Sequence, residues 1–281
     1  MDATVFAAVL FAAACHAGWN AVLKMGVEPF MATALIATAS GIIAIPLIPL
    51  VGLPPLAATP WLIASVILHV GYYIGLTEAY RTGDMGQVYP IARGSAPLMT
   101  ASASAVVLGE MLPTVGWAGI AVLASGVFLM SFRGGRDLAK MDRRAIGFAL
   151  FTAVTICGYS IVDGMGARVS GNAHAYAVSL FFWDGLAMVV MASIRRGSAY
   201  PIALLRQWKS AFIGGALSFL AYWIAIWAMT VAPIAIVAAL RETSVLFAAA
   251  IAVFVLREPL RPIRIAAAFM IVCGLGLIRL S

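Results

Sequence analysis

Residues 4–24 read TVFAAVLFAAACHAGWNAVLK, a stretch that carries no charged residue before Lys24. A helix of about 20 apolar residues is needed to cross the roughly 30 Å hydrocarbon core of a bilayer. The stretch therefore predicts a transmembrane helix. It has no basic residue ahead of its apolar run, so it lacks the pattern of a cleaved signal peptide, and we expect it to be retained.

Comparable apolar windows follow along the rest of the chain. Of its 281 residues, 63% are hydrophobic and 10% are charged, whereas about a quarter of a soluble domain is charged. This composition excludes an ordinary soluble enzyme, a disordered protein and a secreted disulfide scaffold. The windows are too long for barrel strands and do not alternate. We therefore expect an all-α membrane protein with ten transmembrane helices, over 4–24, 30–52, 60–80, 86–108, 114–132, 145–167, 173–194, 210–230, 234–256 and 261–279. Prolines should kink or interrupt the second and fourth spans, at Pro46, Pro49, Pro90 and Pro97.

The two halves of the chain repeat short patterns in the same order. Residues 18–22 (GWNAV) match 158–162 (GYSIV) at a shift of 140, and Arg93 matches Arg241 at a shift of 148. Each half holds five spans, and an odd number forces the second copy to lie upside down in the membrane. We expect two inverted five-helix repeats around a central cavity: residues 1–132, a cytoplasmic basic linker over 133–144, and residues 145–281.

Basic residues are distributed unevenly between the two sides. Of the 18 Lys and Arg residues, fourteen lie in the loops after odd-numbered spans or at the span ends beside them, whereas Arg168 and Arg279 are on the opposite side. Cytoplasmic loops of membrane proteins carry an excess of Lys and Arg. The count predicts that the loops after odd-numbered spans are cytoplasmic and that both termini lie outside.

The remaining two basic residues, Arg93 and Arg241, lie inside predicted spans at matching positions. An arginine at that depth costs at least about 2.5 kcal/mol unless it pairs, snorkels or meets water. We therefore expect both to be functional, as gate residues or as partners of a substrate carboxylate. Arg241 and Glu242 are adjacent, so on a helix they should point apart.

Other polar and aromatic residues inside spans are further candidates, because transporter substrate sites lie near the bilayer midplane between repeats. We expect a cavity lined by the first, third, fourth, sixth, eighth and ninth spans. Its candidate residues are His16, Trp19, Asn20, Tyr73, Tyr89, Arg93, Tyr159, Asp163, Tyr222, Trp223, Trp227, Arg241 and Thr243. The candidates for carrying a coupling proton are His16, Asp163, Asp184 and Glu242. Aromatic residues such as Tyr89 are equally typical of the aromatic belt at the membrane interface. Asp184 could equally form a structural hydrogen bond between helices.

Motifs of other protein classes are missing from the sequence. It has no H-E-x-x-H helix, no G-x-S-x-G elbow, no Walker loop and no channel filter motif. The three cysteines have no metal-ligand spacing. We expect neither an enzyme nor a metal or cofactor site. The net charge of +7 follows from the loops, so no nucleic-acid partner is expected.

Two matching segments carry a resemblance to a known family. Gly109-Glu110 and Arg257-Glu258 each precede a glycine-containing helix, with Gly116, Gly119 and Gly126 in the first half and Gly274 and Gly276 in the second. With ten spans in two repeats, the chain resembles the EamA family of the drug/metabolite transporter superfamily, and among its members the YddG-type bacterial aromatic amino-acid exporters. The resemblance implies a secondary transporter with a central cavity and with the fifth and tenth helices outside it. Many relatives are drawn with both termini in the cytoplasm, whereas the charge count here predicts the reverse.

The resemblance implies export of aromatic and other amphiphilic amino acids, such as Phe, Trp, Thr and Met, across the bacterial inner membrane by alternating access. A drug or nucleotide-sugar carrier of the same fold is the alternative within transport. A channel or an intramembrane enzyme is the alternative from another class. We expect the small residues of the fifth and tenth spans to serve scaffold packing or a homodimer.

Overall fold

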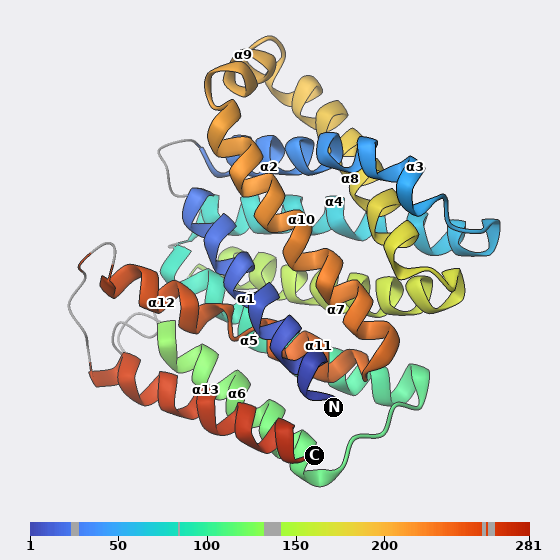
Figure 1. Cartoon of the computed structure of the whole chain (residues 1–281). Helices are drawn as coiled ribbons and strands as arrows, with labels where there is room; N and C mark the ends of the chain where they lie inside the picture. The colour runs from blue at the N-terminus through green and yellow to red at the C-terminus, as the bar shows by residue number, and fades with distance from the viewer. Residues whose placement is uncertain (24–27, 84, 132–141, 255–256, 258–261) are drawn as a thin grey trace.

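The structure is a computed structural model that describes residues 1–23, 28–83, 85–131, 142–254, 257 and 262–281 (Figure 1). Within these ranges, the side chains of residues 23, 85–87, 89, 90, 131 and 252 are not described. Most of the predicted linker 133–144 lies outside the described residues.

The described part of the chain is helical and contains no strand. The first half comprises α1 (Ala3–Leu23), α2 (Pro29–Ala44), η1 (Ile45–Leu47), α3 (Ile48–Val51), η2 (Leu56–Ala58), α4 (Thr59–Thr82), α5 (Met85–Ala103), η3 (Ser104–Leu108) and α6 (Thr114–Ser131). The second half comprises α7 (Arg143–Ser170), α8 (Ala173–Arg196), α9 (Ala199–Arg206), α10 (Trp208–Val231), α11 (Ile234–Arg241), α12 (Ser244–Phe254) and α13 (Pro262–Leu280).

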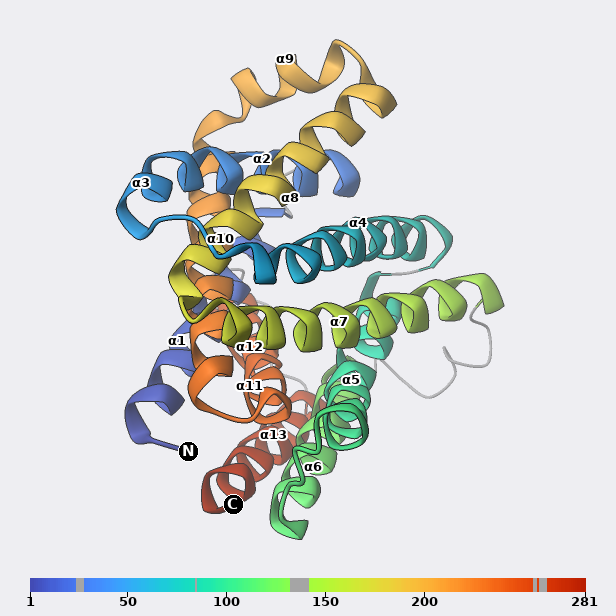
Figure 2. The same ribbon diagram turned by 90° about the vertical axis from the view of Figure 1, so that its right-hand side faces the viewer.

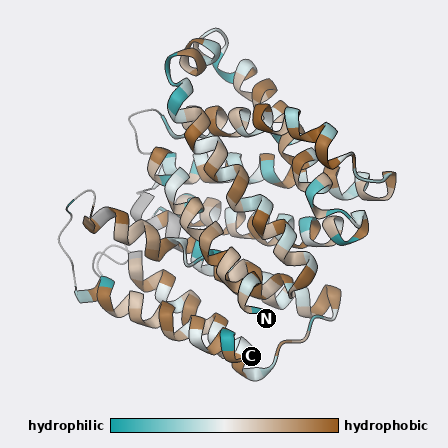
Figure 3. Ribbon diagram, in the orientation of Figure 1, coloured by the Kyte–Doolittle hydropathy of each residue, from teal (hydrophilic) through white to brown (hydrophobic). Residues whose placement is uncertain are grey.

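The predicted spans agree with these helices. Among the described residues, nine helical stretches are long and apolar enough to cross a membrane, and Thr114–Met130 is a shorter apolar helix in the fifth position. Large apolar side chains such as Ile67, Val106 and Phe269 are exposed, and Figure 3 shows hydrophobic residues along most of the helices. Exposed apolar side chains are expected of a protein whose helices are surrounded by the hydrocarbon core of a bilayer.

Several spans are less regular than predicted. The second span breaks after Ala44, where Pro46 and Pro49 fall in the short η1 and α3. In the fourth span the prolines do not interrupt the helix, because α5 runs through Pro90 and Pro97; a kink there stays a prediction. Its irregular turn is the π-helix η3, which ends at Gly109 with φ of 68°. Proline is tolerated in transmembrane helices where neighbouring groups satisfy the freed carbonyl.

The ninth span is the most important departure from a continuous helix. It divides into α11, which ends at Arg241, and α12, which begins at Ser244. The amide groups of Glu242 and Thr243 donate to the carbonyls three residues back, at Ala239 and Leu240. The tight turn thus interrupts a transmembrane helix in its middle, at a polar sequence.

The connection predicted over residues 195–209 contains a helix that the sequence reading missed. α9 begins at Ala199, and Pro201 lies in its first turn, where a missing amide donor costs little. Tyr200 is buried against α2, α8 and α10 residues, whereas Leu205 is exposed. The basic residues and the proline of this segment indicate a loop, so its amphipathic pattern was not recognised as a helix.

Helix packing follows the relation expected of two inverted halves (Figures 1 and 2). α4 packs on α7, and their repeat equivalents α10 and α1 pack on each other. α5 packs on α7, and equivalently α11 and α12 pack on α1. The pairs α2–α8 and α6–α13 each join a helix to its own equivalent. The exact boundaries of the two repeats stay a prediction.

Small residues allow the two self-equivalent pairs to cross closely. A Cβ at Gly185 of α8 would lie 2.8 Å from Gly41 Cα in α2, and a Cβ at Gly274 of α13 would lie 2.7 Å from the Leu123 nitrogen in α6. Small residues let transmembrane helices approach, and van der Waals packing then holds them. Gly119, Gly126 and Gly274 therefore serve packing between α6 and α13 within one chain.

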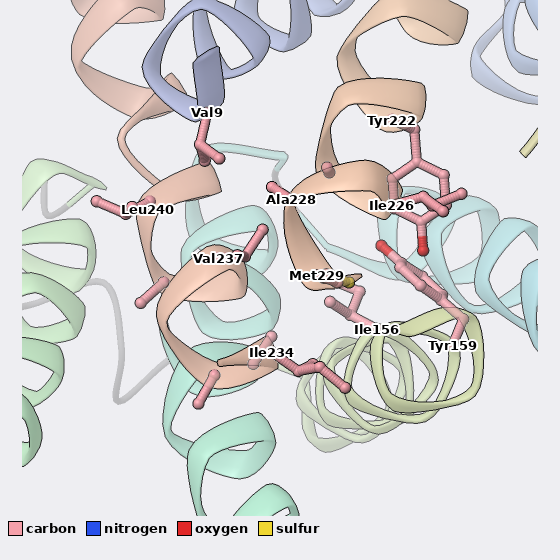
Figure 4. Close-up of a cluster of buried hydrophobic side chains, with 14 of the residues drawn as sticks. Val9, Ile156, Tyr159, Tyr222, Ile226, Ala228, Met229, Ile234, Val237 and Leu240 are labelled. Atoms are coloured by element: carbon pink, nitrogen blue, oxygen red, sulfur yellow. The ribbon is translucent and has the colours of Figure 1, made fainter. Parts of the chain in front are cut away.

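The centre of the bundle is packed from both halves. Figure 4 shows Val9 of α1, Tyr159 of α7, Tyr222 of α10 and Leu240 of α11 in one buried cluster. The two chain ends lie together at one side, where the Arg279 side chain donates to the carbonyl of Met1. This places both termini at the same end of the bundle.

Candidate functional site

A cavity lies among the middle turns of seven helices. Its lining comes from α1, α2, α4, α7, α8, α10 and α11, namely His16, Trp19, Thr33, Ile36, Ala37, Ser40, His69, Tyr72, Tyr73, Tyr159, Leu180, Phe181, Asp184, Ser218, Tyr222 and Arg241. Its volume is about 70 Å³, whereas one water molecule needs about 10–15 Å³ of such space. In this conformation the cavity has room for a few waters.

The lining differs from the expected set of helices. α2 and α8 contribute to it, and neither was expected to do so. No residue of α5 that the structure describes lines the cavity, although the fourth span was predicted to do so. The reason is the packing of α2 against both α8 and α10, which brings these helices to the centre. Small polar residues such as Thr33 and Ser40 gave too weak a signal to predict this.

Arg241 brings a positive charge to the cavity. It is the last residue of α11, at the break in the ninth span, and it is 7% exposed. Its guanidinium carbon lies 4.6 Å from the centre of the Tyr222 ring, a cation–π arrangement. No carboxylate among the described residues forms an ion pair with it. The cavity therefore contains a buried cation without a carboxylate counter-ion.

Arg93 has different surroundings, although the repeat pattern pairs it with Arg241. It is 2% exposed, and its Nε lies 2.9 Å from Glu242 Oε2 in a buried ion pair. Its Nη2 also donates to Ser244 Oγ at 3.4 Å. Arg93 is outside the cavity lining. The ion pair links α5 to the break between α11 and α12.

His16 connects this ion pair to the cavity wall. Trp19 Nε1 donates to His16 Nδ1 at 3.2 Å, and Arg93 Nη2 lies 2.7 Å from His16 Nε2. Both neighbours offer only N–H donors, whereas a neutral imidazole has one acceptor nitrogen and an imidazolium has none. Protonation of His16 would remove its acceptor and place a second positive charge beside Arg93.

Two buried aspartates have unequal hydrogen-bonding partners. Asp163 in α7 accepts hydrogen bonds from Tyr176 at 3.0 Å and from the Tyr222 hydroxyl, and it is outside the cavity lining. Asp184 in α8 lines the cavity, and its Oδ2 accepts from the Tyr73 hydroxyl at 2.6 Å. Its Oδ1 is buried and has no hydrogen-bond partner among the described residues.

Aromatic rings from both halves form one wall of the cavity. The His69 ring stacks on Tyr159 at 4.3 Å between centroids, and Tyr159 meets the edges of Tyr72 and Tyr222 at 5.9 and 5.8 Å. Such pairs favour these offset and edge-on arrangements. The stacked His69 also lines the cavity.

Several predicted site residues lie elsewhere. Asn20 donates to the backbone carbonyl of His16, and Thr243 bonds the carbonyl of Leu240 inside the helix break. Trp223 donates to His174, and neither it nor Trp227 lines the cavity. The side chain of Tyr89 is outside the described residues. Helical spacing put these residues on roughly the right turns but did not fix which face meets the cavity.

The end of the bundle that carries the termini is tied together by a second ion pair. Arg168 of α7 pairs with Glu110 at 2.6 Å and donates to the carbonyls of Met229 and Ala232 at the end of α10. Glu110 also accepts from the Ile234 amide at the start of α11, at 2.9 Å. These contacts hold α7, α10 and α11 together on one side of the cavity.

Comparison with known proteins agrees with this architecture. Residues 143–280 match the EamA-like transporter family. No curated protein matches the chain. The chain is similar to solved structures, among them a crystal structure of a protein with a TM-score of 0.77 and 17% sequence identity, covering 99% of this chain and 96% of that one. At this identity the likeness concerns the fold alone. Residues 143–280 therefore carry the match to the EamA-like transporter family, within a chain whose described residues include nine helical stretches long and apolar enough to cross a membrane.

Proposed function

We propose that this protein is a secondary transporter that exports amino acids across the bacterial inner membrane. One observation carries the proposal: the guanidinium of Arg241 lies in a cavity among the middle turns of the helices, beside aromatic rings, and no carboxylate of the described residues forms an ion pair with it. A buried unpaired charge is costly in a membrane. A substrate carboxylate would supply the missing partner.

The lining fits the rest of an amphiphilic amino acid. Tyr159, Tyr222 and Phe181 present rings to the cavity, and aromatic walls hold apolar or ring-bearing side chains well. Phenylalanine, tryptophan, threonine and methionine are the substrates of choice for testing, as the resemblance to YddG-type exporters suggests.

Transport would require the cavity to open. Its volume of about 70 Å³ is well below the roughly 300–1,000 Å³ of ordinary ligand pockets. The Arg168–Glu110 contacts hold one end of the cavity together, and alternating access would release them and close the opposite end. The broken ninth span supports this proposal, because discontinuous helices commonly form transporter substrate sites.

Within this proposal His16 is the leading coupling residue, and Asp163, Asp184 and Glu242 are the other candidates. Protonating His16 would disturb its contact with Arg93, and Arg93 bonds to both sides of the helix break through Glu242 and Ser244. A proton taken up there would thus alter the contacts that hold α11 and α12 in place. The homodimer through α6 and α13 and the external termini are part of the same proposal.

Counterflow in proteoliposomes tests the proposal. Vesicles loaded with unlabelled amino acid are offered the labelled one outside, and a carrier gives saturable accumulation. Exchange of drugs or nucleotide sugars in place of amino acids would favour the alternative carrier. Passive flux without saturation would favour a channel, and a chemically altered product an enzyme.

A further inference from the structure

Asp184 is the second charge-bearing group in the cavity that lacks a full set of partners. It is 4% exposed, and the Tyr73 hydroxyl satisfies its Oδ2 at 2.6 Å. The buried Oδ1 has no hydrogen-bond partner among the described residues. An unsatisfied carboxylate oxygen in a buried site costs more than the hydrogen bond it lacks, so this arrangement favours a ligand that donates hydrogen bonds.

The other acidic residues near the centre are already occupied. Asp163 accepts two tyrosine hydroxyls and lies outside the lining, and Glu242 pairs with Arg93. Asp184 and Arg241 are therefore the carboxylate and the guanidinium that line the same cavity. Each is positioned by a tyrosine, since Tyr73 of α4 bonds Asp184 and the ring of Tyr222 lies beneath Arg241.

We propose that the cavity recognises a zwitterion by both ends: Asp184 receives the protonated amino group of the substrate and Arg241 receives its carboxylate. This inference rests on the proposed function and narrows it to ligands that carry both charges. A protonated amine has three N–H donors and can satisfy Asp184 Oδ1, as Tyr73 satisfies Oδ2.

Selectivity follows from the charges left unpaired by an incomplete ligand. A ligand that has a carboxylate but no amine gives the buried Asp184 no partner. A ligand that has an amine but no carboxylate gives Arg241 no carboxylate partner. Sites with hydrogen-bonding groups for both ends of a substrate strongly reject analogues that lack one of them. The side chain of the substrate would contact the aromatic wall around Tyr159. The site would therefore select less strongly among side chains than between the presence and absence of the two charged groups.

The test is competition in counterflow of labelled phenylalanine, with phenylalanine, 3-phenylpropionate and phenethylamine as unlabelled competitors. In the wild-type protein we expect the two incomplete analogues to need at least tenfold higher concentrations for half inhibition. In Asp184→Asn, the phenylalanine concentration that gives half-saturation should rise at least tenfold. The concentration of 3-phenylpropionate that gives half inhibition should change less than twofold. Ser179→Ala is the matched control, because Ser179 is buried in the same helix and is outside the cavity lining.

The outcomes separate the two proposals. Equal inhibition of the wild type by phenylalanine and 3-phenylpropionate would overturn the zwitterion inference while amino-acid transport stands, and this arm needs no variant to fold. An Asp184→Asn protein that exchanges phenylalanine normally and loses only proton-driven export would overturn it too, because counterflow requires no net proton movement. Absence of any amino-acid exchange by folded wild type would overturn the proposed function and this inference with it.

Discussion

Matching residues in the two halves of this protein have taken different roles. Arg93 and Arg241 correspond in the repeat, yet Arg93 is neutralised by Glu242 and Arg241 faces the cavity. A repeat pattern in the sequence identifies equivalent positions but carries no information on which one faces a carboxylate. We therefore expect Arg93 to matter mainly for folding and Arg241 mainly for substrate.

Glu242→Gln should destabilise the protein strongly, because it leaves the buried guanidinium of Arg93 without its partner. Breaking one side of a buried pair costs about 3–5 kcal/mol, more than the pair itself contributes. Equilibrium unfolding of the protein in detergent, followed by tryptophan fluorescence, measures this loss.

The control for this variant is the double substitution Arg93→Gln with Glu242→Gln. Two neutral amides leave neither member of the pair as an unpaired charge, so the double variant should recover most of the lost free energy of unfolding. If the single and double variants were both about as stable as wild type, the ion pair would be unimportant for stability.

The candidate site could be predicted from sequence only in part. His16, Trp19, Tyr73, Tyr159, Tyr222 and Arg241 were expected as cavity residues from polarity within spans, and they line the cavity; Asp184 also lines it, although it was expected only as a coupling candidate or a structural residue. The run Arg241-Glu242-Thr243-Ser244 is the signal for the helix break, since four polar residues in sequence are all buried there. It was read as part of a continuous helix because no glycine or proline marks it.

At the scale of helices, close crossings replace the hydrophobic driving force that a bilayer does not provide. Gly274→Ala should weaken the α6–α13 crossing, because a Cβ there would lie 2.8 Å from the Gly119 carbonyl oxygen and 2.7 Å from the Leu123 nitrogen. Overpacking of this kind costs about 1–3 kcal/mol. Gly276→Ala is the control in the same helix, because no atom lies within 4 Å of its added Cβ. Equal unfolding temperatures for the two variants would show that the crossing does not need a glycine.

The helix α9 is docked through Tyr200, whose hydroxyl bonds that of Thr38 in α2. Burial raises the pKa of Tyr200 above its ordinary value, an effect that the Thr38 hydrogen bond partly opposes. The hydroxyl therefore keeps its proton below its ordinary pKa of about 10, and its contribution is lost only as pH rises through the raised value. Tyr200→Phe should cost about 0.5–1.5 kcal/mol of unfolding free energy at neutral pH. Tyr200→Ala should cost about 3–5 kcal/mol, because it also leaves a cavity.

A Tyr200→Phe protein as stable as wild type, measured by thermal unfolding in the same detergent, would mean that the hydroxyl contact does not hold α9. The sequence could not predict this helix, because its one buried anchor is visible only once α2 and α8 are in place. The ten spans were predictable because length and apolar content alone determine them.

For the whole molecule, both termini lie at one end of the bundle, and the charge count predicts that this end is outside the cell. Ser281→Cys, in a background with Cys15, Cys157 and Cys273 replaced by Ala, should be labelled by a membrane-impermeant maleimide in intact cells. Labelling only after the membrane is permeabilised would reverse the orientation.

The central claim is that Arg241 binds the carboxylate of an amino acid during transport. The most direct measurement compares saturable counterflow of labelled phenylalanine by wild type and Arg241→Gln, reconstituted at equal amounts of folded protein. We predict that the phenylalanine concentration for half-saturation rises at least tenfold in the variant, which corresponds to a loss of about 1.4 kcal/mol of binding free energy. An unchanged saturation curve would contradict the account.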